Sequence, residues 1–181
     1  MMEIYERAIK PILPKHFDEN EWFILAISLI VGVAVYYITF KRRKLTWSEI
    51  ICISLLNLQM TTIGDYFLAM PPYDFYDTID NGSGELMDIF LQNLVYPGTL
   101  LFFMHVYKSK RPQKWVFILL CTAILGMLEW ISLQFHLFSY KTWKISYSVL
   151  FYCFVMIVNV VFYEKLRKYL VQRRRDSPPV R

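Results

Sequence analysis

Long apolar runs alternate with short polar segments along most of the chain. Five of these runs reach the length of about 17–25 mostly apolar residues that an α-helix needs to cross the hydrocarbon core of a bilayer. They cover residues 22–40, 47–70, 85–107, 115–138 and 143–163. The pattern therefore predicts an all-α fold, an integral membrane bundle of five transmembrane helices.

The composition supports this prediction. Hydrophobic residues make up 56% of the 181 residues and charged residues only 19%, and the mean hydropathy is +0.33. A soluble chain of this length forms one domain with a modest core, which cannot bury so much apolar surface. Tryptophan placement agrees, since indole rings favour the membrane–water interface. The interfacial anchors expected at span ends are Trp22, Trp47, Trp115 and Trp143.

The distribution of basic residues predicts the orientation. With five spans, 15 of the 20 Lys and Arg residues fall on the side that holds the 41–46 and 108–114 segments and the C-terminal tail. By the positive-inside rule this side is cytoplasmic, so the N-terminus is outside. We expect residues 1–21 to form an extracytoplasmic segment and residues 22–165 the membrane domain. Residues 166–181 are expected to form a disordered basic tail that binds anionic lipid headgroups.

Polar side chains inside the spans are the candidate functional residues, because burying them in hydrocarbon is expensive. They form three helical stripes: Asn57, Thr61 and Asp65; Glu85, Asp88 and Gln92; and Thr122, Gly126, Glu129 and His136. We predict a buried polar site made by Asp65, Asp88, Gln92 and Glu129 in the outer half of the membrane, shared in particular by Asp88 and Glu129. Two interpretations stay open. Neutral acids can join the helices through hydrogen bonds, or the carboxylates can bind a proton, a cation or a small ligand.

Two other features each allow a structural and a functional interpretation. The 71–84 segment is acidic and rich in turn residues, which suits either a solvated outer loop or a shallow mouth that attracts cations. Pro97 and Gly98 predict a break in the third span, either a packing kink or a hinge beside a cavity.

The sequence lacks the common catalytic templates. It has no H-E-x-x-H or G-x-S-x-G motif. His16, His105 and His136 are scattered, and three isolated cysteines lie in apolar runs, so we expect no metal site and no cofactor. Nucleic-acid binding is not expected either.

Several short features give the chain a family resemblance. They are the basic residues 41–44, Tyr96 and Pro97 in the third span, Glu129 in the fourth, and Tyr140 with Trp143 before the fifth. With these features, residues 22–165 resemble a family of small uncharacterised multi-pass membrane proteins of bacilli and clostridia. The acidic 71–84 segment and the extended basic tail depart from that family. The resemblance implies a bacterial plasma membrane and carries no reaction with it.

Three function classes follow, in this order. The first is a non-enzymatic accessory or scaffold component of the membrane, in contact with another membrane protein or a second copy of itself. The second is a small transporter or a proton- or ion-conducting subunit that uses buried carboxylates. The third, an intramembrane enzyme, is disfavoured because the sequence offers no pair of nucleophile and base.

The orientation yields the first testable prediction. A C-terminal reporter that is active only in the cytoplasm should be active when fused to this chain, because the basic segments hold that end inside. A reporter that works only outside the cytoplasm should be silent in the same position. The opposite pair of results would reverse the topology.

Overall fold

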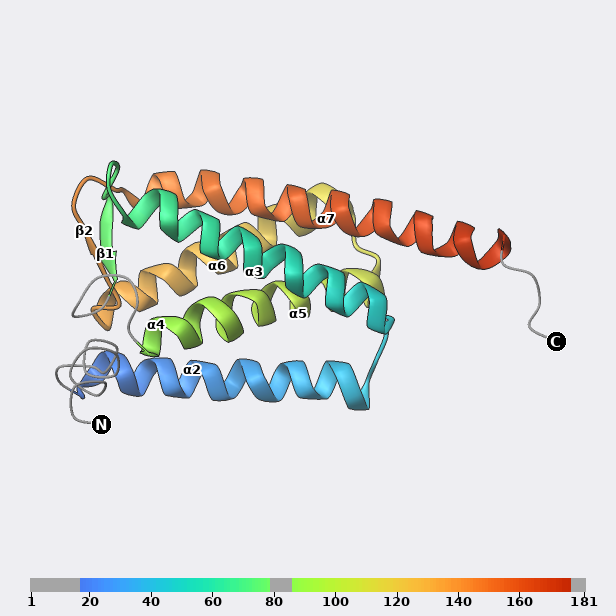
Figure 1. Cartoon of the computed structure of the whole chain (residues 1–181), viewed down its shortest axis with the longest axis horizontal. Coiled ribbons are helices and arrows are strands. Elements are labelled where there is room, and N and C mark those ends of the chain that lie inside the picture. Colours follow the sequence, from blue (N-terminus) through green and yellow to red (C-terminus); the bar gives the residue numbers. More distant parts are fainter. Residues whose placement is uncertain (1–16, 79–85, 177–181) are drawn as a thin grey trace, which may run out of the picture.

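The computed structural model describes residues 17–78 and 86–176, and over these ranges the chain forms a bundle of long helices (Figure 1). The elements in order are α2 (Glu19–Tyr36), η3 (Tyr37–Lys41), α3 (Trp47–Ala69), β1 (Tyr76–Thr78), α4 (Leu86–Phe90), η4 (Leu91–Val95), α5 (Tyr96–Lys110), α6 (Lys114–Gln134), β2 (Phe138–Tyr140) and α7 (Ile145–Asp176). The elements η3 and η4 are single-turn π-helical segments.

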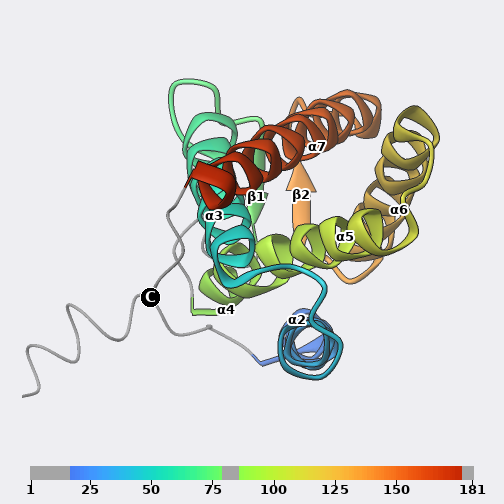
Figure 2. The ribbon, with the colours of Figure 1, turned by 90° about the vertical axis from the view of Figure 1, so that its right-hand side faces the viewer.

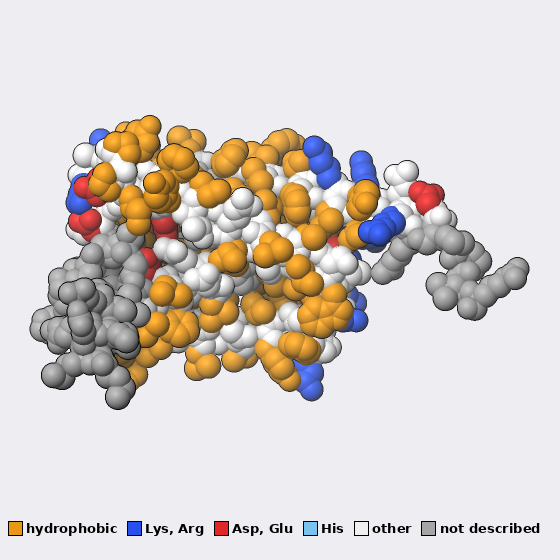
Figure 3. Space-filling view, in the orientation of Figure 1, with side chains coloured by type: hydrophobic (Ala, Val, Ile, Leu, Met, Phe, Trp, Pro, Cys, Tyr) orange, Lys and Arg blue, Asp and Glu red, His pale blue; other side chains and the backbone are white. Residues whose placement is uncertain are grey.

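Five stretches of the described chain are long and apolar enough to span a membrane, as predicted. They are Glu19–Lys41, Trp47–Ala69, Leu86–Lys110, Lys114–Gln134 and Ile145–Arg173. Large apolar side chains remain exposed along their flanks, for example Leu29, Leu55 and Leu150. Figure 3 shows this apolar cover over the flank of the bundle, with most of the visible basic side chains near the end where α7 projects. A protein with this surface is an integral, multi-pass membrane protein.

Helices α3, α5, α6 and α7 surround the centre when the bundle is viewed along its axis, and α2 lies outside them (Figure 2). The most extensive neighbours are α6 with α7 and α3 with α5, while α2 packs on α5 and η4 from outside. Two hydrophobic clusters fill the interior, one centred on Ile53, Met104 and Met156 and the other on Ile24 and Leu137. We call the end that carries β1 and β2 the capped end, and the end toward which α7 runs the basic end.

Capping residues define where α2 and α3 begin. Asp18 and Thr46 each accept a hydrogen bond from the first helical turn, and Glu21 and Glu49 bond back to the N-cap backbone. These capping boxes satisfy backbone N–H groups that the helix itself leaves free. The first and second spans therefore begin close to the predicted positions.

The fourth span is shorter than predicted. Helix α6 ends at Gln134, and His136 has a positive φ of 54°, which turns the chain away from the helix axis. The apolar residues that extended the prediction to 138 pack inside the capped end instead. Phe135 stacks on Phe23 at 4.5 Å between ring centroids, and Leu137 is 1% exposed.

The prediction that residues 166–181 are disordered is wrong for residues 166–176. Helix α7 continues to Asp176 and projects beyond the rest of the bundle (Figure 1). The residues after Tyr163 are mostly Lys, Arg, Leu, Gln and Glu, which have good helix propensity. They can therefore extend a helix that the membrane has already nucleated. The remaining residues 177–181, and the predicted outer segment up to residue 16, lie outside the described ranges.

The third span contains a π-helical turn just before the predicted break, and the helix continues through it. The π-helical turn η4 separates α4 from α5, and Pro97 is the second residue of α5. Because proline has no N–H, it cannot donate to the carbonyl of Asn93 four residues earlier. Gly98 has a separate role: a Cβ atom at this position would lie 2.6 Å from Cγ1 of Val31 and 3.1 Å from Cγ2 of Val35. Gly98 thus allows α5 to approach α2 closely, as small residues do between membrane helices.

This contact yields a stability prediction. Gly98→Ala should lower the stability by about 1–3 kcal/mol, because the added methyl overpacks the contact with stiff β-branched side chains. Gly32→Ala is the matched control, since a Cβ there meets nothing within 4 Å. Thermal unfolding in detergent measures both, and Val31→Ala should restore much of the loss in the Gly98→Ala background. Equal melting temperatures for Gly98→Ala and Gly32→Ala would contradict this packing role.

Candidate functional site

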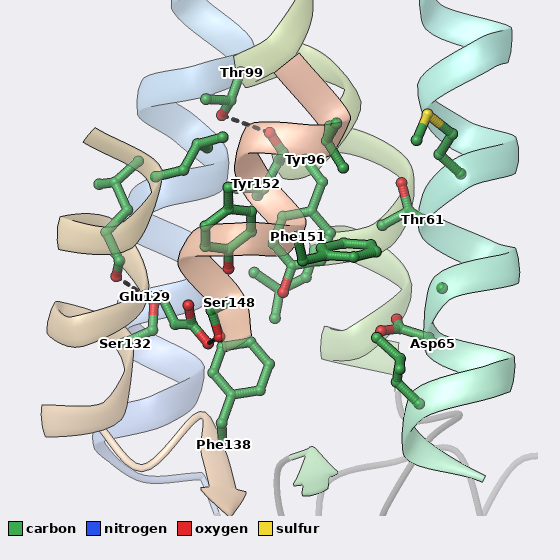
Figure 4. Close-up of a pocket in the computed structure, with 18 of the residues that line it drawn as sticks. Thr61, Asp65, Tyr96, Thr99, Glu129, Ser132, Phe138, Ser148, Phe151 and Tyr152 are labelled. Carbon is green, nitrogen blue, oxygen red and sulfur yellow. Dashed lines mark hydrogen bonds between the residues drawn. The ribbon is translucent and has the colours of Figure 1, made fainter. Parts of the chain in front are cut away.

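A cavity of about 190 Å³ lies inside the capped half of the bundle. Helices α3, α5, α6 and α7 form its walls, residues of β1 and β2 close it toward the capped end, and Phe23 and Ile27 of α2 also contribute. Figure 4 shows Glu129 of α6 and Asp65 of α3 on opposite sides, with Tyr96, Phe151 and Tyr152 between them. The lining thus combines two carboxylates with several aromatic rings, and no Lys or Arg belongs to it.

Glu129 is held at the end of a hydrogen-bond chain. The Ser148 hydroxyl donates to Oε1 of Glu129 at 2.6 Å, and the Tyr140 hydroxyl donates to the same oxygen. The indole Nε1 of Trp143 donates to Oγ of Ser148 at 2.7 Å. The second oxygen, Oε2, is buried and makes no hydrogen bond of ordinary geometry in the described residues, although the Tyr152 hydroxyl is close enough to act on Glu129. Glu129 is 8% exposed, so this oxygen is an unused acceptor in a low-dielectric cavity.

Asp65 accepts a hydrogen bond from strand β1 in a similar way. The hydroxyl of Tyr76 in β1 donates to Oδ1 of Asp65 at 2.8 Å. Burial raises the pKa of Tyr76, and the negative charge of the Asp65 carboxylate raises it further. Burial, followed by the hydrogen bond to Glu129, likewise raises the pKa of Tyr140 in β2. Both phenols therefore keep their protons at neutral pH and act as fixed donors to the two carboxylates.

The cap is a small antiparallel ribbon in which Tyr76, Asp77 and Thr78 pair with Tyr140, Ser139 and Phe138. Lys141 stabilises it through ion pairs, with Nζ 2.8 Å from Oδ1 of Asp77 and 2.9 Å from Oδ2 of Asp74. The contact with Asp77 raises the pKa of Lys141 most, and the contact with Asp74 adds to this effect. The stabilisation is therefore complete below the pKa of a free lysine and is lost only as the pH rises through the higher folded value. These ion pairs give Asp74 and Asp77 of the acidic 71–84 segment a structural role. Asp80 of the same segment lies outside the described residues.

The predicted site residues divide into two groups. Asp65 and Glu129 both line the cavity, together with Asn57 and Thr61 of the α3 stripe. Asp88 and Gln92 do not line it: Gln92 Nε2 donates to Oδ2 of Asp88 at 2.9 Å. Gln92 is also close enough to act on Asp65, so this second group adjoins the cavity that Asp65 and Glu129 line. Glu85 of the same predicted stripe lies outside the described residues.

Other predicted residues have structural contacts. Trp22, Trp47 and Trp115 are exposed near helix starts, as interfacial anchors would be. Trp143 instead packs on Phe75 and Tyr76 and closes the cavity. Within the described residues no group of three or more His, Cys, Asp or Glu side chains has an arrangement that could hold a metal ion.

Several important residues were not among the predicted ones. Asn159 of α7 exchanges two hydrogen bonds with Asn57 of α3, at 2.7 and 2.9 Å. It is 1% exposed, and its signal in the sequence was a single amide within the apolar stretch MIVNVVF. Ser148 and Tyr152 also line the cavity and were missed because Ser and Tyr are common in membrane helices and form no motif here. Tyr96 was noted only for the family resemblance and not as a site residue.

Neither protein-family models, nor curated proteins, nor solved structures show a match to this chain. The geometry of the cavity therefore carries the functional argument alone, and the family resemblance stays a prediction.

The hydrogen bonds of Glu129 yield a second stability prediction. Glu129→Gln should leave the melting temperature close to that of the unchanged protein, because an amide oxygen can still accept from Tyr140 and Ser148. Glu129→Leu should cost about 1–3 kcal/mol, since it leaves those hydroxyls without their acceptor. Ser132→Ala is a mild control, as Ser132 lines the cavity and donates to the carbonyl of Leu128 in its own helix. If Glu129→Gln destabilised the protein as much as Glu129→Leu, the carboxylate itself would be needed for folding.

Proposed function

We propose that the protein binds a small organic cation, an amine or quaternary ammonium, in the cavity of its capped half. The observation that carries this proposal is the buried Glu129 oxygen without a partner, which lies in a cavity lined by aromatic rings. A buried carboxylate without a basic partner favours a cationic ligand, since the ligand supplies the missing charge. The faces of aromatic rings also attract organic cations, and this attraction is stronger where water is excluded.

The size of the cavity limits the ligand. A cavity of about 190 Å³ is slightly larger than the roughly 150 Å³ that accommodates benzene in an engineered protein cavity. It is smaller than the roughly 300–1,000 Å³ of pockets for drug-sized molecules. A compact cation with one ammonium group and a short organic part fits these limits, and a lipid or a peptide does not.

The proposal includes the membrane that holds the protein and the side of that membrane on which the cavity lies. The excess of basic residues at one end supports a cytoplasmic C-terminus, which turns the capped end and its cavity toward the outside of the cell. The family resemblance supports a bacterial plasma membrane. The protein would then act as a non-enzymatic binding component, which fits an accessory role beside another membrane protein and requires no catalytic residue.

Transport of the bound cation is the second candidate, favoured by the π-helical turn in the third span. Leu91 and Val95 of η4 both line the cavity, and a π-helical turn followed by proline is a place where a helix can change shape. Transporters use such interrupted helices beside midplane binding sites. Uptake of choline by proteoliposomes containing the protein would separate transport from binding alone.

The proposal predicts selective binding of choline as a test cation. Calorimetric titration of the purified protein should show choline binding more tightly than 3,3-dimethylbutan-1-ol, the uncharged molecule of nearly the same shape. Glu129→Gln and Asp65→Asn should each weaken choline binding by about 10- to 100-fold, because an amide cannot supply the negative charge. The affinity for the alcohol should stay nearly unchanged.

Glu164→Gln serves as the matched control, since Glu164 is a carboxylate at the basic end that does not line the cavity. It should bind choline as the unchanged protein does. Equal affinities for choline and the alcohol, or equal losses in all three variants, would show that the carboxylates hold the bundle together and bind no cation.

A further inference from the structure

A second concave region lies at the basic end, separate from the cavity. It is a groove of about 1010 Å³ between the last turn of α5 and the projecting part of α7. Five basic side chains line it, and two acidic ones, Glu164 and Asp176, are also present. The basic residues are Lys108, Arg111, Arg167, Lys168 and Arg175.

The ion pairs near the groove use few of its charges. Lys108 binds Glu49 with an N–O distance of 2.6 Å, and Glu164 binds Lys114 at 2.9 Å. Glu164 also accepts a hydrogen bond from Tyr107 at 2.9 Å. In the described residues the other four cations of the groove, Arg111, Arg167, Lys168 and Arg175, have no such ion pair. The groove therefore carries an excess of positive charge.

A buried hydroxyl lies among these cations. Tyr163 lines the groove and is 2% exposed. Its hydroxyl makes no hydrogen bond of ordinary geometry within the described residues, and Glu49, Arg167 and Arg111 are all close enough to act on it electrostatically. Lys108 already binds the Glu49 carboxylate, so the two guanidinium groups remain a favourable environment for an anion with several oxygens.

We propose that this groove binds the phosphate group of an anionic phospholipid from the leaflet at the basic end. Arg111 and Arg167 would bind the phosphate oxygens, and the Tyr163 hydroxyl would donate to one of them. The position of the groove favours a lipid over a soluble anion. Trp47 and Trp115, which are 47% and 60% exposed, begin α3 and α6 at this same end. Exposed indoles lie at headgroup level, so the groove opens where lipid phosphates are.

Native mass spectrometry of the full-length protein in neutral detergent tests this proposal, with phosphatidylglycerol and phosphatidylcholine of identical chains as probes. The protein should retain one phosphatidylglycerol with about tenfold preference over phosphatidylcholine. Arg167→Gln with Lys168→Gln should abolish the preference. Tyr163→Phe should reduce phosphatidylglycerol binding severalfold without lowering the melting temperature, because the hydroxyl gains no hydrogen bond in the free protein.

Arg42→Gln with Arg43→Gln is the matched control, which removes the same charge from exposed positions at the basic end outside the groove. It should keep the preference. Displacement of the lipid by millimolar inorganic phosphate would assign the site to a soluble anion and overturn the lipid proposal. No preference for phosphatidylglycerol, or equal losses in the groove and control variants, would overturn the proposal.

Discussion

The structure depends on one constraint: a polar group inside hydrocarbon has no water to bind, so it must find its partner within the bundle. The amide pair of Asn57 and Asn159 is the simplest result, since it exchanges two hydrogen bonds between α3 and α7. Hydroxyls such as Thr99 and Ser132 meet the same requirement locally by donating to carbonyls one turn earlier. Apolar side chains are then left to face the lipid, which explains the exposed Leu and Ile residues along the flanks.

This requirement is not met everywhere: in the described residues Glu21 Oε1, Ser28 Oγ and Glu129 Oε2 are among the buried atoms without a hydrogen-bond partner. Of these three residues, only Glu129 lines the cavity. Tyr76 and Tyr140 bring hydrogen-bond donors from the ribbon to Asp65 and Glu129, and Lys141 fixes the ribbon from outside. One oxygen of Glu129 is still without a partner in the described residues. A protein under selection for stability alone would gain by filling this cavity with apolar side chains. An unfilled cavity with an unused carboxylate oxygen is therefore better explained by a ligand that completes it.

The sequence was sufficient to predict the helices, because the length and apolarity of each run are set by the thickness of the bilayer. It also placed Asp65 and Glu129 inside the bundle, because helical periodicity puts Asn57, Thr61 and Asp65 on one face. It could not predict which stripes meet. That choice depends on how the helices pack, and contacts such as that of Gly98 with Val31 and Val35 leave no recognisable signal in the sequence. The ribbon was missed for a similar reason, since its strands are separated by two spans and its aromatic residues resemble those of a membrane helix.

The central claim is that a small cation occupies the cavity between Glu129 and Asp65. The most direct test is photolabelling of the membrane-embedded protein with a compact quaternary ammonium that carries a diazirine, followed by peptide mapping. If the cation binds there, labels should appear on cavity-lining residues such as Phe151 and Tyr152 of α7 and disappear when excess choline competes. Labels confined to lipid-facing residues such as Leu150 and Phe154, or labels that choline does not reduce, would contradict it.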